Sequence, residues 1–186
     1  MELIGTVVRL QVQRSRLKPG PPGARVYDPT PLLEVDALEV GPRGCVGRLG
    51  EATFVDVHHA DHPDTRNVKL ANSLSLLPRA AYPRLQARYG EHLRVGAAGE
   101  SVLVDVAGPW PDGDLLLETD DEPLLLAHVQ PAPPCVEFSR FCLGLPVGVM
   151  DGVEVALTEL GGGARGFYAK PQSQGVVTVG AQLWRA

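Results

Sequence analysis

Glycine and proline interrupt this chain at short intervals, and their spacing limits the folds that it can adopt. The 186 residues include 21 glycines and 17 prolines, so about one residue in five breaks or bends a regular element. Hydrophobic residues nevertheless make up 44% of the chain, which is enough for an aliphatic core. The segments between the breaks are short, which favours a sheet with many turns over a bundle of long helices.

Alternation of apolar and polar residues predicts the strands between these breaks. The clearest case is Glu2–Gln13, which alternates throughout and is rich in β-branched residues. Further strands are predicted at residues 32–40, 52–57, 101–106, 114–118, 124–130, 166–170 and 176–183. Residues 18–30 and 58–64 contain proline or paired Asp residues that oppose regular structure, and both are predicted to be irregular.

Three short helices complete the prediction. One covers residues 82–89 and ends at a glycine, and a second begins at Val136. The third runs over residues 152–160, with Asp151 and Glu154 at the spacing of a capping box. Many short strands with few short helices predict a mainly β fold, a barrel-like rolled sheet, in one domain that spans the whole chain.

Charge and composition limit the expected partners and compartment. The chain has 17 Lys and Arg against 22 Asp and Glu, a formal net charge of −5, with both signs spread along it. Without a basic stripe, no nucleic-acid partner is expected, and without about 18 consecutive apolar residues, no membrane span is expected. Three cysteines and no signal-peptide pattern at the start favour a cytoplasmic location.

Cys135 is the first candidate for chemistry. It follows a rigid Pro-Ala-Pro-Pro segment and precedes the helix that is predicted from Val136. The partial positive charge of a helix N-terminus favours a thiolate, which could act as a sulfur nucleophile, a persulfide carrier or a soft metal ligand. Judged from its position alone, a buried structural cysteine is the favoured alternative.

A second cluster of polar residues lies in the irregular segment 58–64. Its potential ligands are His58, His59, Asp61, His62 and Asp64. Pro63 opposes the helix that would place His58 and His62 on one face, and no spacing for a fourth ligand accompanies them, so a loop at a pocket edge is favoured over a metal site. Arg66 follows directly and could bind an anion.

The glycine-rich segment 161–166 resembles a phosphate-binding nest, in which successive small residues let backbone N–H groups converge. It lacks the Gly-Lys-Ser/Thr ending of a P-loop. A helix end needs only one glycine, so the additional glycines and Arg165 favour a functional backbone here.

Five segments, taken in order, carry a family resemblance. They are Gly5–Val12, Gly44–Gly47, Arg88–Leu93 leading to Gly96–Val104, Val129–Pro131 leading to Pro134-Cys135, and Gly163–Ala169 with Gly175–Gly180. Together they resemble the MOSC domain, a family named for the C-terminal part of molybdenum-cofactor sulfurases. The resemblance covers nearly the whole chain, and Pro134-Cys135 matches the Pro-Cys at the signature cysteine of the family.

The resemblance implies a β-rich, barrel-like fold and a molybdenum cofactor (molybdopterin). Cys135 would carry sulfane sulfur or ligate the molybdenum. The residues expected to hold the cofactor are Arg66, Gly99, Glu100, Ser101, Arg165 and Lys170. Gly99, Glu100 and Ser101 correspond to the Gly-Glu-Asn of the family, with serine in place of asparagine, and the three basic residues would face the phosphate. Residues 47–50 stand where relatives often have Gly-Asp-Arg-His.

The resemblance therefore predicts either a sulfur carrier or an oxidoreductase that reduces N-hydroxylated compounds. The chain leaves no room for the pyridoxal-phosphate domain of the sulfurases, so pyridoxal phosphate would act only through a separate partner protein. A reductase would need a redox partner, because no flavin, haem or iron–sulfur motif is present. Two alternatives stay open: a non-catalytic ligand-binding module with a lapsed cofactor site, and a metal-binding protein that uses the histidine loop.

Overall fold

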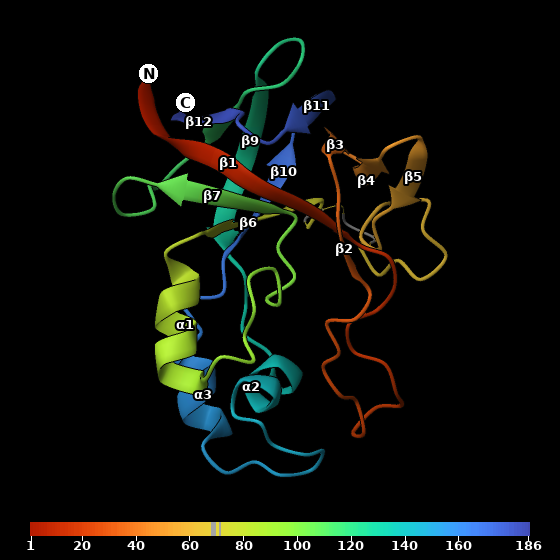
Figure 1. Cartoon of the computed structure of the whole chain (residues 1–186), viewed down its shortest axis with the longest axis vertical. Coiled ribbons are helices and arrows are strands. Elements are labelled where there is room, and N and C mark those ends of the chain that lie inside the picture. Colours follow the sequence, from red (N-terminus) through yellow and green to blue (C-terminus); the bar gives the residue numbers. More distant parts are fainter. Residues whose placement is uncertain (68–69, 71) are drawn as a thin grey trace.

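A computed structural model describes residues 1–67, 70 and 72–186. The main sheet of the described chain contains β1 (Glu2–Gln13), β6 (Leu74–Pro78), β7 (Val102–Val106), β8 (Leu115–Leu117), β9 (Leu124–Pro131), β10 (Phe167–Pro171) and β12 (Gln182–Arg185). These strands follow one another in the order β12-β8-β9-β10-β6-β7-β1, and β1 pairs back with β12 to close a barrel (Figure 1). Strands β6 and β7 are parallel, whereas the other neighbours are antiparallel.

The barrel interior is filled by aliphatic side chains from alternate strand positions. Leu115 and Leu117 in β8 and Leu124 and Leu126 in β9 are completely buried. A spacing of two residues places side chains on the same face of a strand, which is why these positions point inward together. Each fully buried leucine contributes about 1.5–3 kcal/mol to folding.

A second sheet lies beside the barrel. It has the order β11 (Gly175–Thr178), β3 (Ala37–Gly41), β4 (Gly44–Leu49) and β5 (Ala52–Val55). The short strand β2 (Leu32–Glu34) pairs with the last residues of β1, so the long first strand extends from the barrel toward this sheet (Figure 1).

The helices gather at one end of the barrel. They are α1 (Ala81–Tyr89), α2 (Val136–Cys142) and α3 (Val153–Glu159), which lie below the strands in Figure 1. They share a second core with buried residues from the adjoining segments: Leu17, Tyr27, Leu77, Tyr82, Leu85, Leu93, Phe138, Cys142, Ala156 and Leu160. Because Leu17 precedes the irregular segment 18–30 and Tyr27 lies within it, this core anchors that segment beside the helices.

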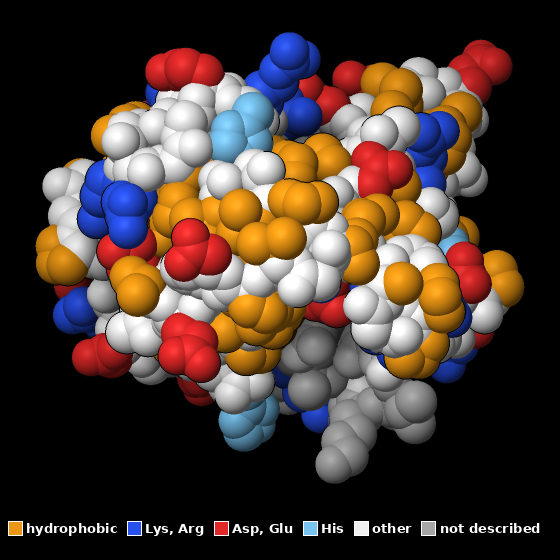
Figure 2. Space-filling view, turned by 90° about the horizontal axis from the view of Figure 1, so that it is seen from below, with side chains coloured by type: hydrophobic (Ala, Val, Ile, Leu, Met, Phe, Trp, Pro, Cys, Tyr) orange, Lys and Arg blue, Asp and Glu red, His pale blue; other side chains and the backbone are white. Residues whose placement is uncertain are grey.

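The end of the molecule that carries the helices exposes apolar side chains. Orange patches spread across this face in the view from below (Figure 2). The connection between α2 and α3 contributes Val147, Val149 and Met150, which are exposed. No helix in the described part of the chain combines the length and the apolar character needed to cross a membrane.

The structure confirms the mainly β, barrel-like fold with a few short helices. The predicted strand Glu2–Gln13 is β1 with the same bounds, and the helix predicted to end before Gly90 is α1. The helix predicted from Val136 is α2. Residues 18–30 and 58–64 contain no helix or strand, in agreement with their turn-forming composition.

Two predicted strands are divided in the structure. Residues 32–40 form β2 and β3, which are separated at Val35 and Asp36 and belong to different sheets. Residues 176–183 are divided by a turn at Gly180, whose φ is +97°, so that β11 and β12 also belong to different sheets. Alternation predicts extended chain but does not reveal where a strand leaves one sheet for another.

The predicted capping box at Asp151 is wrong. The N-cap of α3 is Gly152 in the left-handed region, with φ +71°, and no side chain caps the helix. Strands β4 and β6 were not predicted.

Candidate functional site

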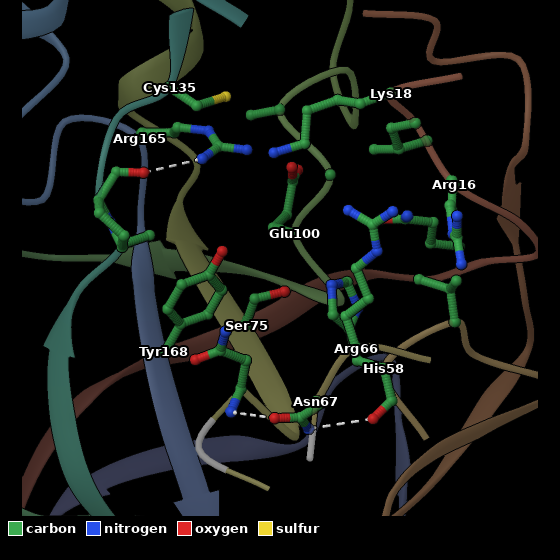
Figure 3. Close-up of a pocket in the computed structure, with 18 of the residues that line it drawn as sticks. Arg16, Lys18, His58, Arg66, Asn67, Ser75, Glu100, Cys135, Arg165 and Tyr168 are labelled. Atoms are coloured by element: carbon green, nitrogen blue, oxygen red, sulfur yellow. Dashed lines mark hydrogen bonds between the residues drawn. The ribbon is translucent and has the colours of Figure 1, made fainter. Parts of the chain in front are cut away.

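A cavity of about 340 Å³ lies where the irregular segments meet strands β6 and β10. Its walls come from six stretches of the described chain: residues 13–27, 57–67, 72–76, 98–100, 132–135 and 165–168. The irregular loops thus supply much of the lining, and the barrel supplies a rigid support behind them (Figure 3). Sites of this construction, with functional loops on a rigid scaffold, are common in enzymes and binding proteins.

Cys135 lines this cavity and is half-buried. It is the N-cap residue of α2, with an extended backbone, and its side chain makes no capping hydrogen bond. The other cysteines are different, because Cys45 and Cys142 are fully buried and lie outside the cavity lining. Burial raises the pKa of the Cys142 thiol to about 12. Cys135 is therefore the thiol that this structure makes accessible to a ligand.

Positive side chains outnumber negative ones in the described lining. The cationic residues are Arg16, Lys18, Arg25, Arg66 and Arg165, and the acidic residues are Asp64 and Glu100. Asp64 is neutralised in part by Arg16, whose guanidinium lies 3.5 Å from the carboxylate. A concave surface with this surplus of guanidinium and ammonium groups concentrates anions even in a chain of negative net charge.

Glu100 forms a buried acidic part of the lining. Its side chain accepts a hydrogen bond from the Tyr82 hydroxyl, which lies 2.9 Å from both carboxylate oxygens. Burial raises the pKa of Glu100 to about 7, against the opposing effects of Tyr82, Arg9 and Arg165. A carboxyl group that titrates near neutral pH inside a cleft is suited to hold or release a proton.

Arg165 is held beside Cys135 by local contacts. Its Nη1 donates to the carbonyl oxygen of Pro133 at 3.0 Å, and its guanidinium carbon lies 5.0 Å from the centre of the Phe138 ring. Its Nε is buried and has no hydrogen-bond partner among the described residues. Arg165 nevertheless lines the cavity, so its guanidinium places a positive charge near Cys135 in the cavity wall.

The glycine-rich segment 161–166 forms the turn that contains Arg165. Its three consecutive glycines do not line the cavity. A Cβ atom at Gly163 would lie 2.3 Å from the Phe167 ring, and one at Gly166 would lie 2.5 Å from the carbonyl oxygen of Leu76. Close packing against β10 and β6 is thus the role that the structure gives to these two glycines.

The structure brings most of the predicted site residues together. Those that line the cavity are Arg66, Gly99, Glu100, Cys135 and Arg165. Ser101 does not line the cavity itself. Its backbone N–H and its hydroxyl form hydrogen bonds with the hydroxyl of Ser75, which does line the cavity. Lys170 is not a lining residue; it lies farther along β10, opposite Ala127 of β9.

The ring nitrogens of the histidine loop are engaged locally. His58 Nδ1 lies 3.0 Å from Asp56, and the Nδ1 atoms of His59 and His62 accept from the backbone N–H groups of Asp61 and Asp64. Among the described residues, no group of three or more His, Cys, Asp or Glu side chains is placed to hold a metal ion. Only His58 of these histidines lines the cavity, where it lies near Asn67 (Figure 3).

Several lining residues were missed by the sequence analysis. They are Arg16, Lys18, Arg25, Tyr27, Ser75 and Tyr168. A signal for some of them was present, since long irregular segments inside a compact fold often carry function. The residue types alone could not distinguish these basic side chains from ordinary surface arginines and lysines.

Solved structures share this fold. YuaD from Bacillus subtilis is 11% identical, with a TM-score of 0.58 over 97% of this chain and 94% of that chain. YiiM from Escherichia coli is 18% identical, with a TM-score of 0.53 over 82% of this chain and 63% of that chain. YiiM from Geobacillus stearothermophilus is also 18% identical, with a TM-score of 0.50 over 98% of this chain and 73% of that chain.

No family model matches this chain, and no curated protein matches it in sequence. YiiM is a MOSC-domain protein, so the shared barrel is a MOSC-like fold. At these identities the likeness is one of fold alone.

Proposed function

We propose that this chain binds molybdopterin in the cavity and uses the sulfur of Cys135. The thiol would either carry sulfane sulfur as a persulfide or serve as a thiolate ligand of the molybdenum. One observation carries the proposal: an accessible thiol stands in the wall of a cation-rich cavity that also contains a buried carboxyl group.

The described residues fit such a group. The cavity volume of about 340 Å³ lies within the range of small-molecule sites, about 300–1,000 Å³. Guanidinium groups bind phosphate in bidentate geometry, and Arg66 and Arg165 bring two such groups to the lining. A thiolate is the soft ligand that suits such a metal, and Cys135 is the thiol of the lining.

Each lining residue would then have a separate task. Arg66 and Arg165 would bind the phosphate of the cofactor. Arg16 would neutralise the carboxylate of Asp64, which would otherwise repel this phosphate. When bound, the cofactor would supply oxygen-atom or sulfur chemistry. Cys135 would hold the sulfur, and Glu100 would hold or release a proton near neutral pH.

This function requires other proteins. A persulfide on Cys135 would be loaded by a separate protein that contains pyridoxal phosphate, and a reductase would receive electrons from a redox partner. All three cysteines are free thiols in the structure, which favours a reducing compartment such as the cytoplasm for this chemistry.

The alternative is a binding module without turnover. The departures from the Gly-Asp-Arg-His pattern motivate it, yet residues 47–50 lie outside the cavity lining. The Arg48 side chain donates instead to Glu39 on the neighbouring strand, at 2.6 Å. The missing Asp and His therefore leave the described cavity unaltered, and the cofactor function is favoured.

Elemental analysis of the purified full chain, with mass detection of a released pterin, tests the proposal. We expect close to one molybdenum and one pterin per chain when the host makes the cofactor. In Cys135→Ala, the molybdenum content should fall, or the extra sulfur mass that a persulfide adds to the peptide containing residue 135 should be absent. The control Cys142→Ala, on the same helix but outside the cavity, should do neither. Protein without molybdenum and pterin would overturn the proposal in favour of the binding module.

A further inference from the structure

Glu100 is a carboxyl group with an unusual set of partners. Its side chain is only 4% exposed although it lines the cavity. Both of its oxygens share one neutral donor, the hydroxyl of Tyr82, at 2.9 Å. No Lys or Arg in the described part of the chain forms an ion pair with it. Its charged form is therefore weakly compensated, in contrast to Asp64, which pairs with Arg16.

Charged and titratable groups surround Glu100 from several elements. Tyr82 approaches from α1, Arg9 acts from β1, and Lys18 and Tyr27 belong to the irregular segment. Arg165 precedes β10 and Cys135 precedes α2. In Figure 3, the side chains of Arg165 and Lys18 both point toward Glu100. The cations attract an anion into the same space in which the ionised carboxylate would repel it.

We infer that Glu100 couples oxyanion binding in this cavity to the uptake of one proton. In its ionised form the carboxylate opposes the anion. In its protonated form it presents an O–H donor, and the cationic side chains act on the anion without opposition. The inference rests on the part of the proposed function that makes the cavity an anion site, and it adds a proton as the second species that binds.

The direction of the pH dependence follows from linkage. Burial places the pKa of Glu100 at about 7 in the free protein, and a bound anion beside it raises this pKa further. Between the two values, each anion that binds takes up one proton from solvent. In that range the affinity falls about tenfold for each unit by which the pH rises.

Calorimetric titration of the full chain with sulfate measures both quantities. Sulfate is the probe because it does not itself titrate between pH 6 and 9. The protein is purified from a host that makes no molybdopterin, and titrations are repeated in buffers of different ionisation enthalpy. We expect close to one proton taken up per sulfate above pH 7.5, and about a tenfold loss of affinity over the next pH unit.

Variants assign the proton to its group. Glu100→Gln should bind sulfate without proton uptake and with a flat pH profile. His58→Gln and Cys135→Ser are controls that remove the histidine and the cysteine of the lining, and both should retain the uptake whatever their affinity. Tyr82→Phe removes the donor that stabilises the carboxylate, so it should shift the pH window upward. This gives a second test should Glu100→Gln fail to fold.

Proton uptake that persists in Glu100→Gln, or its absence in the unaltered chain, would overturn the inference while leaving an anion site in place. A failure of sulfate to bind at any pH would overturn it as well. The proposed function is judged separately, by molybdenum and pterin in protein from a host that makes the cofactor, so the two failures are distinguishable.

Discussion

The hydroxyl of Tyr82 lies 2.9 Å from each carboxylate oxygen of Glu100. The same hydroxyl accepts a hydrogen bond from the backbone N–H of Ala98, at 3.2 Å. One side chain of α1 therefore positions both the loop and the acidic group of the cavity. Because these groups are buried, the ionisation of Glu100 and the stability of the fold are coupled through this contact.

The pH dependence of stability should report the burial of Glu100. Burial raises its pKa from 4.5 to about 7, so the folded state binds more protons than the unfolded state between these values. The free energy of unfolding of the unaltered chain should therefore fall by about 3 kcal/mol, relative to that of Glu100→Gln, as the pH rises from 4.5 to 7. Urea unfolding of both proteins at several pH values measures this difference.

The exposed carboxyl of Glu91 offers a matched control, because Glu91→Gln removes a surface charge without altering the cavity. Its stability should follow the unaltered chain at every pH. Parallel profiles for Glu100→Gln and the unaltered chain would show that the Glu100 carboxyl is solvated in solution.

Tyr82→Phe should destabilise the fold by about 1–3 kcal/mol, because the buried Ala98 N–H and the Glu100 carboxyl both lose a partner. The loss should be greater at pH 8 than at pH 5, since hydrogen bonds to an ionised carboxylate are stronger than those to a neutral one. Thermal or urea unfolding at the two pH values tests this. Tyr89→Phe, which removes a hydroxyl bonded to the exposed Glu159, should cost less than 1 kcal/mol.

Gly166→Ala should cost about 2–5 kcal/mol of stability. The backbone at this position has φ +107°, and a Cβ atom would lie 2.5 Å from the carbonyl oxygen of Leu76. Gly162→Ala is the control, because Gly162 has φ +60° and open space around it, and it should cost only about 1–2 kcal/mol. Equal losses of stability in the two variants would argue against the packing of this turn on β6.

Alkylation should distinguish the three thiols in the native protein. Cys135 should react first, because it is half-buried at the cavity, whereas Cys45 and Cys142 are enclosed. Burial raises the pKa of the Cys45 thiol well above its usual range, which further suppresses its reaction. Peptide mass mapping before and after denaturation measures the order. Native labelling of Cys142 at the rate of Cys135 would contradict the structure.

The sequence alone determined the elements whose signals are local. The alternation of β1 and the end of α1 at Gly90 were predicted correctly, because side-chain periodicity and turn chemistry act over a few residues. The position of Cys135 at the start of α2 was likewise predicted, since the prolines before it exclude a continuing helix.

Local sequence patterns did not predict elements whose residues are constrained by contacts with residues distant in the sequence. Gly47 falls outside every predicted strand, yet it lies within β4, and a Cβ atom there would come within 2.8 Å of Val12 and Val35. This glycine is needed for packing between strands, which composition does not reveal. The apolar run of β6 is buried in the barrel, and a run of this kind has no period that distinguishes a strand from a helix.

Only the tertiary structure decided which charges meet. Arg16 and Lys18 belong to the stretch between β1 and β2, which lacks periodicity, and their place in the same cavity as Cys135 depends on how that stretch packs against the helices. Lys170 was expected in the same cavity but lies farther along its strand. Closure of the barrel by β1 and β12 joins the two ends of the chain. Such contacts between distant residues depend on the packing of the whole chain, to which a local sequence pattern is insensitive.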